Sequence, residues 1–154
     1  MKDQVLSIDQ MRHLRDLGID TQEEDILLKD LSTRLPYGVK VQLSTNEVGI
    51  LHQIAKRTCT VFITPSDFFD VSINDIKPYL FPSSSITKDQ MIEFSNISNA
   101  IYIYPSDAEI VVSRARENLL QFVPVFDWLN KNHFDYRGLI SKRLAIDATN
   151  LNIY

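Results

Sequence analysis

Apolar and polar residues alternate between residues 37 and 64, and this period of two predicts β-strands with one buried face. The alternation divides into strands over residues 37–43, 48–55 and 58–64, and a shorter strand is expected over 70–74. Residues 75–78 resemble a single helical turn that ends at the proline. Four or five short strands within about forty residues are typical of a small barrel, so the pattern predicts an SH3-like β-barrel over residues 36–81.

Three segments carry a hydroxyl residue followed three positions later by Glu or Gln, the capping box that begins a helix. The three pairs are Ser7 with Gln10, Thr87 with Gln90, and Ser106 with Glu109. They predict helices over residues 8–17, 87–95 and 106–123. Residues 101–104 form a candidate edge strand, and residues 19–35 are ambiguous.

The segment after the third predicted helix has a helix–turn–helix pattern over residues 125–143. Pro124 interrupts the preceding helix. It fits the first turn of a new helix, because N–H groups in that turn have no acceptor within the helix and proline therefore forfeits no hydrogen bond. Asp135 is the expected N-cap of a last short helix.

Together these elements predict an α+β protein with three regions. They are a helical N-terminal arm (1–35), the SH3-like barrel (36–81) and a helical C-terminal region (82–154). The pattern leaves open whether the three regions share one core.

The composition is that of an ordinary globular protein of 154 residues, with 44% hydrophobic and 23% charged side chains. No apolar run approaches the roughly 18 residues that a membrane span needs, and the N-terminus lacks the apolar core of a signal peptide. The single cysteine, Cys59, has no second thiol for a disulfide or a CxxC metal site. We therefore expect a cytoplasmic protein with no membrane partner and no cofactor.

The net charge of −4 disfavours nucleic-acid binding, which needs several cations on one face. The basic residues that could gather on one face are Lys131, Arg137, Lys142 and Arg143.

Aromatic residues concentrate near the C-terminal end. Trp128, the only tryptophan, lies with four other aromatic residues between Phe122 and Tyr136. The helical spacing of Phe122, Phe126 and Leu129 indicates a core stripe. The other aromatic residues, together with a nearby arginine, have the composition that is common at protein interfaces. For each of these rings, packing in the core is the alternative. This candidate binding site comprises Trp128, Phe134, Tyr136 and Arg137.

His133 and Asp135 form the one candidate catalytic pair, because a carboxylate can orient an imidazole for acid–base chemistry or metal binding. No second histidine lies at ligand spacing, and a histidine that caps the preceding helix is the better interpretation. Cys59 lies in a β-branched strand without a nearby cation, which is typical of a buried core thiol.

Three stretches resemble an uncharacterised family of small proteins from gut Bacteroidetes and their phages or prophages. They read LPYGVK (35–40), IKPYLFPSSSIT (76–87) and FDWLNKNHFDYRGLISKRLAIDA (126–148). Two departures are Ser83, where a bulkier apolar residue is expected, and a more basic end at Ser141, Lys142 and Arg143. The resemblance implies a phage or mobile-element origin and carries no activity or cofactor.

We therefore expect a non-enzymatic interaction module that binds another protein or its own copy, as an accessory protein of a phage or mobile element. The first alternative is a nucleic-acid-binding regulator that uses the barrel or residues 125–143. The second is an enzyme centred on His133 and Asp135.

Overall fold

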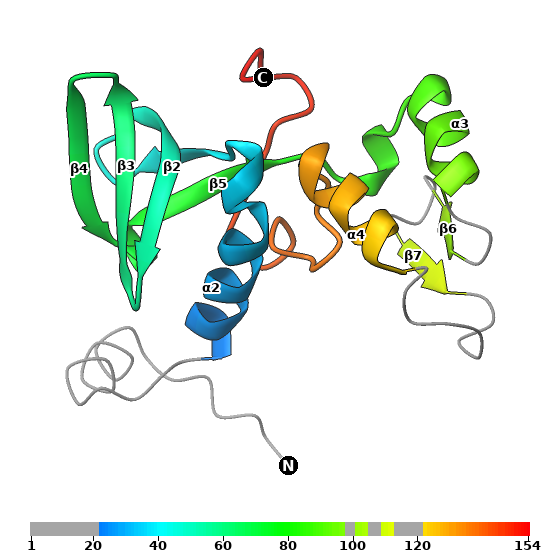
Figure 1. Cartoon of the computed structure of the whole chain (residues 1–154), viewed down its shortest axis with the longest axis horizontal. Helices are drawn as coiled ribbons and strands as arrows, with labels where there is room; N and C mark the ends of the chain where they lie inside the picture. The colour runs from blue at the N-terminus through cyan, green and yellow to red at the C-terminus, as the bar shows by residue number, and fades with distance from the viewer. Residues whose placement is uncertain (1–21, 98–100, 105–108, 113–121) are drawn as a thin grey trace.

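The computed structural model describes residues 22–97, 101–104, 109–112 and 122–154, and it shows an α+β fold (Figure 1). The helix expected over residues 8–17 lies outside these residues. The helix expected over 106–123 is contradicted in part, because residues 109–112 form a strand. Among the described residues, no helix is long and apolar enough to cross a membrane.

An open, six-stranded sheet occupies one side of the molecule, with the strand order β4-β3-β2-β1-β5-β8. The strands are β1 (Lys40–Leu43), β2 (Val48–Ala55), β3 (Thr58–Thr64), β4 (Asp67–Ser72), β5 (Ile76–Leu80) and β8 (Ile146–Asp147). All neighbours pair antiparallel except β5 and β8, which are parallel. Because β4 and β8 are opposite edges that do not pair, the closed SH3-like barrel is not confirmed.

Period-two patterning sets which side chains of the sheet are buried. Leu51 in β2 and Cys59 and Val61 in β3 are at most 2% exposed, while their neighbours in the chain face outward. Helix α2 (Gln22–Arg34) packs on this inner face through Leu27 and Leu31. The main core thus forms between one helix and the concave side of the sheet.

Residues 75–78 do not form the expected helical turn. A short 3₁₀-helix, η2 (Ile73–Asp75), precedes β5, and Pro78 lies inside that strand opposite Val41 of β1. On its other side, β5 pairs with β8 at Tyr79 and Leu80 only. Pro78, which has no N–H to donate, therefore lies outside that pairing.

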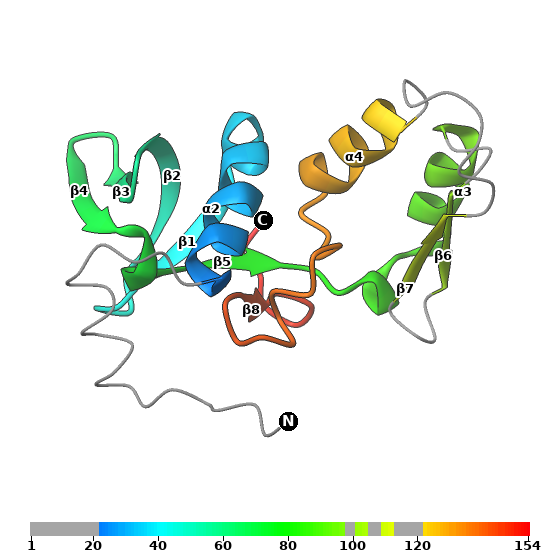
Figure 2. The same ribbon diagram turned by 90° about the horizontal axis from the view of Figure 1, so that it is seen from below.

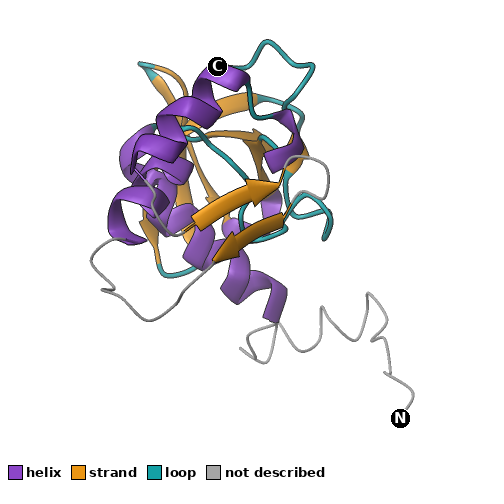
Figure 3. Cartoon of the chain, turned by 90° about the vertical axis from the view of Figure 1, so that its right-hand side faces the viewer, coloured by secondary structure: helices purple, strands orange, loops and turns teal. Residues whose placement is uncertain are grey.

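A second core forms between helices α3 (Lys88–Ile97) and α4 (Phe122–Lys131). Trp128 of α4 stacks on Phe134 at 5.5 Å between ring centroids and meets Phe94 of α3 edge-on at 5.3 Å. Pro124 lies in the first turn of α4, as predicted. Strands β6 (Ile101–Tyr104) and β7 (Glu109–Val112) pair at this end of the molecule (Figure 3).

The capping box at the start of α3 is confirmed. The Thr87 N–H donates to Gln90 Oε1 at 2.9 Å, and the Gln90 N–H donates to Thr87 Oγ1 at 3.2 Å. The reciprocal pair satisfies two of the backbone donors that a helix N-terminus leaves open.

The segment after α4 joins the two cores and contains turns instead of a second helix (Figure 2). The helix–turn–helix expected over residues 125–143 is therefore wrong. Gly138 and Arg143 adopt left-handed φ angles of 71° and 61°, which interrupt any helix there. Asp135 still accepts backbone hydrogen bonds, from the N–H groups of Leu139 and Ile140 at 2.9 and 2.8 Å. A carboxylate cap thus holds a compact turn.

The three regions expected from the sequence contribute to the same main core. Leu31 comes from the first region, Val41 from the second, and Leu139 and Ala145 from the third.

Candidate functional site

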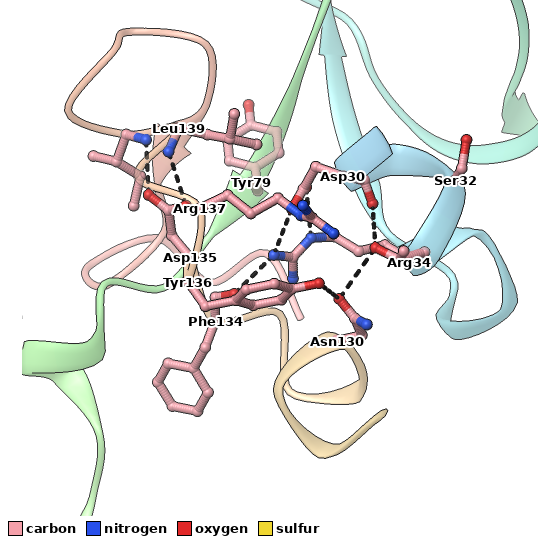
Figure 4. A network of polar contacts seen from close by, with 12 residues as sticks. Asp30, Ser32, Arg34, Tyr79, Asn130, Phe134, Asp135, Tyr136, Arg137 and Leu139 are labelled. Atoms are coloured by element: carbon pink, nitrogen blue, oxygen red, sulfur yellow. Dashed lines mark hydrogen bonds and ion pairs between the residues drawn. The ribbon is translucent and has the colours of Figure 1, made fainter. Parts of the chain in front are cut away.

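The end of α2, the end of α4 and residues 134–137 meet at one place between the two cores (Figure 4). The polar network there contains two of the four residues of the candidate binding site, Tyr136 and Arg137. The other two, Trp128 and Phe134, are only 5% and 1% exposed and belong to the second core. The proposal that these four residues form a binding surface therefore rests on the polar pair.

A fully buried ion pair is at the centre of this network. Asp30 and Arg34 lie one helical turn apart in α2, and both side chains are 0% exposed. Arg34 donates from Nε to Asp30 Oδ2 at 2.7 Å and from Nη2 to Asp30 Oδ1 at 3.0 Å. Nη2 also donates to the Phe134 carbonyl at 2.8 Å, so the pair fastens the C-terminal segment to α2.

Tyr136 lies beside two guanidinium groups. The centre of its ring is 5.3 Å from Cζ of Arg34 and 5.1 Å from Cζ of Arg137, within the range of cation–π attraction. Its hydroxyl donates to Asn130 Oδ1 at 3.0 Å, and its ring centroid is 5.3 Å from that of Phe126. The Tyr136 side chain is therefore held by the two guanidinium groups and Phe126 at its ring and by Asn130 at its hydroxyl.

Arg137 is more accessible than the buried pair, with 33% of its side chain exposed against 0% for Asp30 and Arg34. Its Nε is 3.5 Å from Asp30 Oδ1, an ion-pair distance too long for a good hydrogen bond. Arg34 takes the short contacts with Asp30 and leaves Arg137 only the long one. The two guanidinium groups thus share the Asp30 carboxylate, while the Asp135 carboxylate binds backbone N–H groups.

Two cavities adjoin the network along α4, and both are lined by Tyr37 and Asp127. The larger has a volume of about 640 Å³ and the smaller about 500 Å³. We call the two together the α4 groove. One helical stripe of α4 lines the larger cavity, namely Val123, Phe126, Asp127 and Asn130. The next stripe lines the smaller one, namely Pro124, Asp127, Trp128 and Lys131.

The wall opposite α4 in the larger cavity comes from the end of α2 and from η1 (Leu35–Tyr37). Tyr37 of η1 and Asp127 of α4 line the same cavities. Desolvation, and then the negative charge of Asp127, raises the pKa of Tyr37, so its hydroxyl stays protonated as a donor. Ile97 of α3 lies at the far end, in the smaller cavity.

Apolar side chains remain exposed in this groove. Val123 is 55% exposed, Phe126 40% and Ile97 36%. The core stripe expected from Phe122, Phe126 and Leu129 is therefore wrong for Phe126, while Leu129 is fully buried and Phe122 half-buried. Exposed apolar groups that line a concave surface are typical of interaction sites.

The candidate pairing of His133 with Asp135, which the sequence ranked below a helix-capping role for this histidine, does not form. The Asp135 carboxylate accepts from Leu139 and Ile140, and the buried imidazole of His133 stacks on Tyr154 with 4.1 Å between ring centroids. Its Nδ1 has no hydrogen-bond partner among the described residues. The geometry shows a packed imidazole instead of an oriented acid–base pair.

Replacing His133 by asparagine is expected to remove an acid-dependent loss of stability. Burial, and then the nearby Arg34 guanidinium, lowers the pKa of His133 from 6.5 to about 4. Between these values the unfolded chain binds the proton and the folded chain does not, so stability is full above pH 6.5 and falls towards pH 4. The free energy of unfolding of the wild type should fall by up to about 3 kcal/mol between pH 7 and pH 4 because His133 becomes protonated.

Urea unfolding at several pH values across this window measures the effect. Asparagine tolerates the left-handed φ of 57° at this position. His52→Asn, which replaces an exposed histidine of β2, serves as the control and should keep the wild-type pH slope. An unchanged slope in His133→Asn would refute the assignment.

Cys59 is buried in β3, and burial raises the pKa of its thiol to about 11, which keeps it protonated and unreactive at neutral pH. No group of three or more His, Cys, Asp or Glu residues with metal-binding geometry occurs in the described part of the chain.

No protein-family model, curated protein or solved structure matches this chain. The resemblance to proteins of gut Bacteroidetes and their phages thus stays a prediction.

Sequence reasoning missed several residues of the site. Asp30 and Arg34 have the i, i+4 spacing of a helical ion pair, and the flanking Leu27 and Leu31 would have indicated a buried face. No local pattern brings Tyr37 to Asp127, because they lie 90 positions apart in the chain and meet only where η1 and α4 line the same cavities.

Proposed function

We propose that this chain is a non-enzymatic interaction module whose α4 groove binds a segment of another protein. The observation that carries the proposal is the exposed apolar pair Val123 and Phe126 on the wall of the larger cavity, beside the held side chains of Tyr136 and Arg137. Such a combination of apolar groups, an aromatic ring and an arginine is the composition of interface hot spots. An accessory role in a phage or mobile element is supported by the sequence resemblance alone.

The form of the groove favours an extended segment as the ligand. It comprises two shallow cavities on adjacent faces of α4 with Asp127 between them, so a ligand that fills both must lie across the helix. An extended chain presents alternate side chains to one surface and could place one in each cavity.

The alternative of nucleic-acid binding has weaker support. The outer face of the sheet carries an aromatic row, in which His52 stacks on Phe62 at 4.2 Å and Phe62 meets Phe68 at 6.0 Å. Acidic Asp67 and Asp70 lie in the neighbouring edge strand, which opposes the attraction of phosphates. The helix–turn–helix route is absent from the fold.

Replacing Val123 and Phe126 together by serine is expected to weaken peptide binding at least about ten-fold, because two apolar contacts of the groove are lost. Ligands would be selected from a random-peptide phage library on the wild-type chain, with counter-selection on the double variant. Their Kd values would then be measured by fluorescence anisotropy.

Phe68→Ser is the matched control, because Phe68 is 60% exposed on β4 and does not line the α4 groove. It should bind the selected peptides as the wild type does, and thermal unfolding should show all variants folded. Failure to enrich any peptide, or equal affinity of the double variant, would overturn the proposal. Light scattering on the free chain tests the remaining possibility of a second copy as the partner.

A further inference from the structure

We infer that the α4 groove recognises a carboxylate, carried by a partner segment next to an apolar side chain, with Arg137 as the anchoring residue. This inference rests on the proposed function and specifies its ligand. Beside the larger cavity, Arg34 takes the short contacts with the buried carboxylate of Asp30, so Arg137 has only a long contact with it.

Arg137 is positioned before any ligand arrives. Its Nε faces Asp30 at 3.5 Å, and its guanidinium lies over the Tyr136 ring at 5.1 Å. These two contacts restrain the group from its inner side. The structure records no hydrogen bond from either Nη atom within residues 22–97 and 122–154, and the side chain lines the larger cavity. The Nη edge is therefore the free edge, and a guanidinium edge pairs best with a planar, two-oxygen acceptor.

Asn130 supplies a second donor to the same cavity. Its Oδ1 accepts from the Tyr136 hydroxyl at 3.0 Å and from Thr33 Oγ1 at 3.4 Å. With the oxygen occupied, the amide nitrogen is the polar atom left for a ligand, and no recorded hydrogen bond of the described residues uses it. Arg137 and Asn130 together offer N–H donors and no acceptor, which suits an anion.

A carboxylate fits better than a phosphoryl group. Asp127 lines the same cavity, so a dianion would face one free guanidinium and one carboxylate. A carboxylate has a single negative charge, so Asp127 repels it about half as strongly as a dianion. It still accepts hydrogen bonds from Arg137 and Asn130. The exposed Val123 and Phe126 on the α4 wall provide the apolar contact for the neighbouring side chain.

The test uses two matched pairs of small probes, and the two members of each pair differ only in carrying a carboxylate or its neutral amide. N-acetyl-phenylalanine carries a terminal carboxylate, and N-acetyl-phenylalanyl-glutamic acid amide carries a side-chain carboxylate. Their neutral partners are N-acetyl-phenylalanine amide and N-acetyl-phenylalanyl-glutamine amide. Titration into the ¹⁵N-labelled full chain, followed by NMR, would report the Asn130 side-chain amide and the Arg137 Nε–H signals.

We expect at least one acidic probe to shift both signals and to bind about ten-fold more tightly than its neutral partner. The responding probe shows whether a chain terminus or an acidic side chain is the source. In Arg137→Met the difference between acidic and neutral probes should vanish. Lys142→Met removes an equal charge from an exposed position that lines neither cavity, and it should leave the difference intact.

Equal binding of acidic and neutral probes in the groove would overturn the carboxylate inference and leave the peptide-binding proposal standing. A difference that survives in Arg137→Met would also overturn the inference. Arg137→Lys is a second variant that keeps the charge without the planar edge, and it should lose several-fold of the preference for acidic probes. If no probe shifts any groove signal and phage selection also fails, both proposals fall.

Discussion

Replacing Asp30 by alanine is expected to lower the free energy of unfolding by about 3–5 kcal/mol, the cost of breaking one side of a buried ion pair. The Arg34 guanidinium would stay in a fully buried site with two of its donors unpartnered and no compensating charge. Arg137 would also lose the only acid within ion-pair distance that the described residues offer it. Urea unfolding followed by circular dichroism measures the difference.

Asp25→Ala in the same helix is the matched control. Asp25 forms an i, i+4 pair with Lys29, but its side chain is 49% exposed and that of Lys29 is 63% exposed. Exposed pairs contribute little, so this variant should lose less than about 1 kcal/mol. Similar losses in the two variants would show that Asp30 and Arg34 do not form the buried pair.

A double variant separates the charge from the packing. Asp30→Leu combined with Arg34→Met removes both charges and keeps apolar volume, so it should recover much of the stability lost in Asp30→Ala. The Phe134 carbonyl still loses its donor, which limits the recovery. A double variant less stable than Asp30→Ala would contradict this explanation.

Replacing Gly49 by alanine is expected to destabilise the fold by about 3 kcal/mol or more, because the paired strand β3 leaves no room for a side chain at this position of β2. A Cβ at this position would lie 2.5 Å from Val61 Cγ1 and 2.6 Å from the Phe62 carbonyl oxygen. The second contact is with backbone, so the strands themselves would have to separate. Thermal or urea unfolding of the purified variant measures the loss.

Gly38 offers a control in which backbone conformation, and not a steric clash, makes alanine unfavourable. Its φ is +65°, and a Cβ there would have no neighbour within 4 Å, so Gly38→Ala meets backbone strain alone and should cost about 1 kcal/mol. Adding Val61→Ala to Gly49→Ala removes the clash with Val61 Cγ1 but leaves those with the Phe62 carbonyl oxygen and Ile63 Cδ1. The combined variant should therefore remain strongly destabilised, and full recovery would refute the backbone explanation.

Elements with local signals were predictable. The strands at residues 40–64 follow from alternation and turns, and α3 follows from the Thr87 capping box, whose hydrogen bonds close within four residues. Elements with competing local signals were not. Ser106 and Glu109 match a capping box, but the β-branched run from Ile110 to Val112 favours a strand, and a strand is formed.

The candidate site was half predictable. Tyr136 and Arg137 stand out in the sequence by their chemistry, and both line the larger cavity. Trp128 and Phe134 have the same chemistry, but their burial depends on α3, whose Phe94 covers the indole from elsewhere in the chain. Composition does not distinguish an exposed ring from a buried one, because both environments favour large aromatic side chains.

The sequence by itself therefore determined the α+β composition, the main strands of the sheet and the aromatic, arginine-bearing segment near the C-terminal end. The tertiary structure alone decided that the sheet stays open, that residues 135–143 form a capped turn, and that Arg137 lies between Asp30 and the α4 groove. The physical reason is the separation along the chain over which each interaction acts. Strand and cap signals act between neighbours in the chain, whereas burial, ion pairing and cavities arise from groups brought together by packing across about a hundred residues.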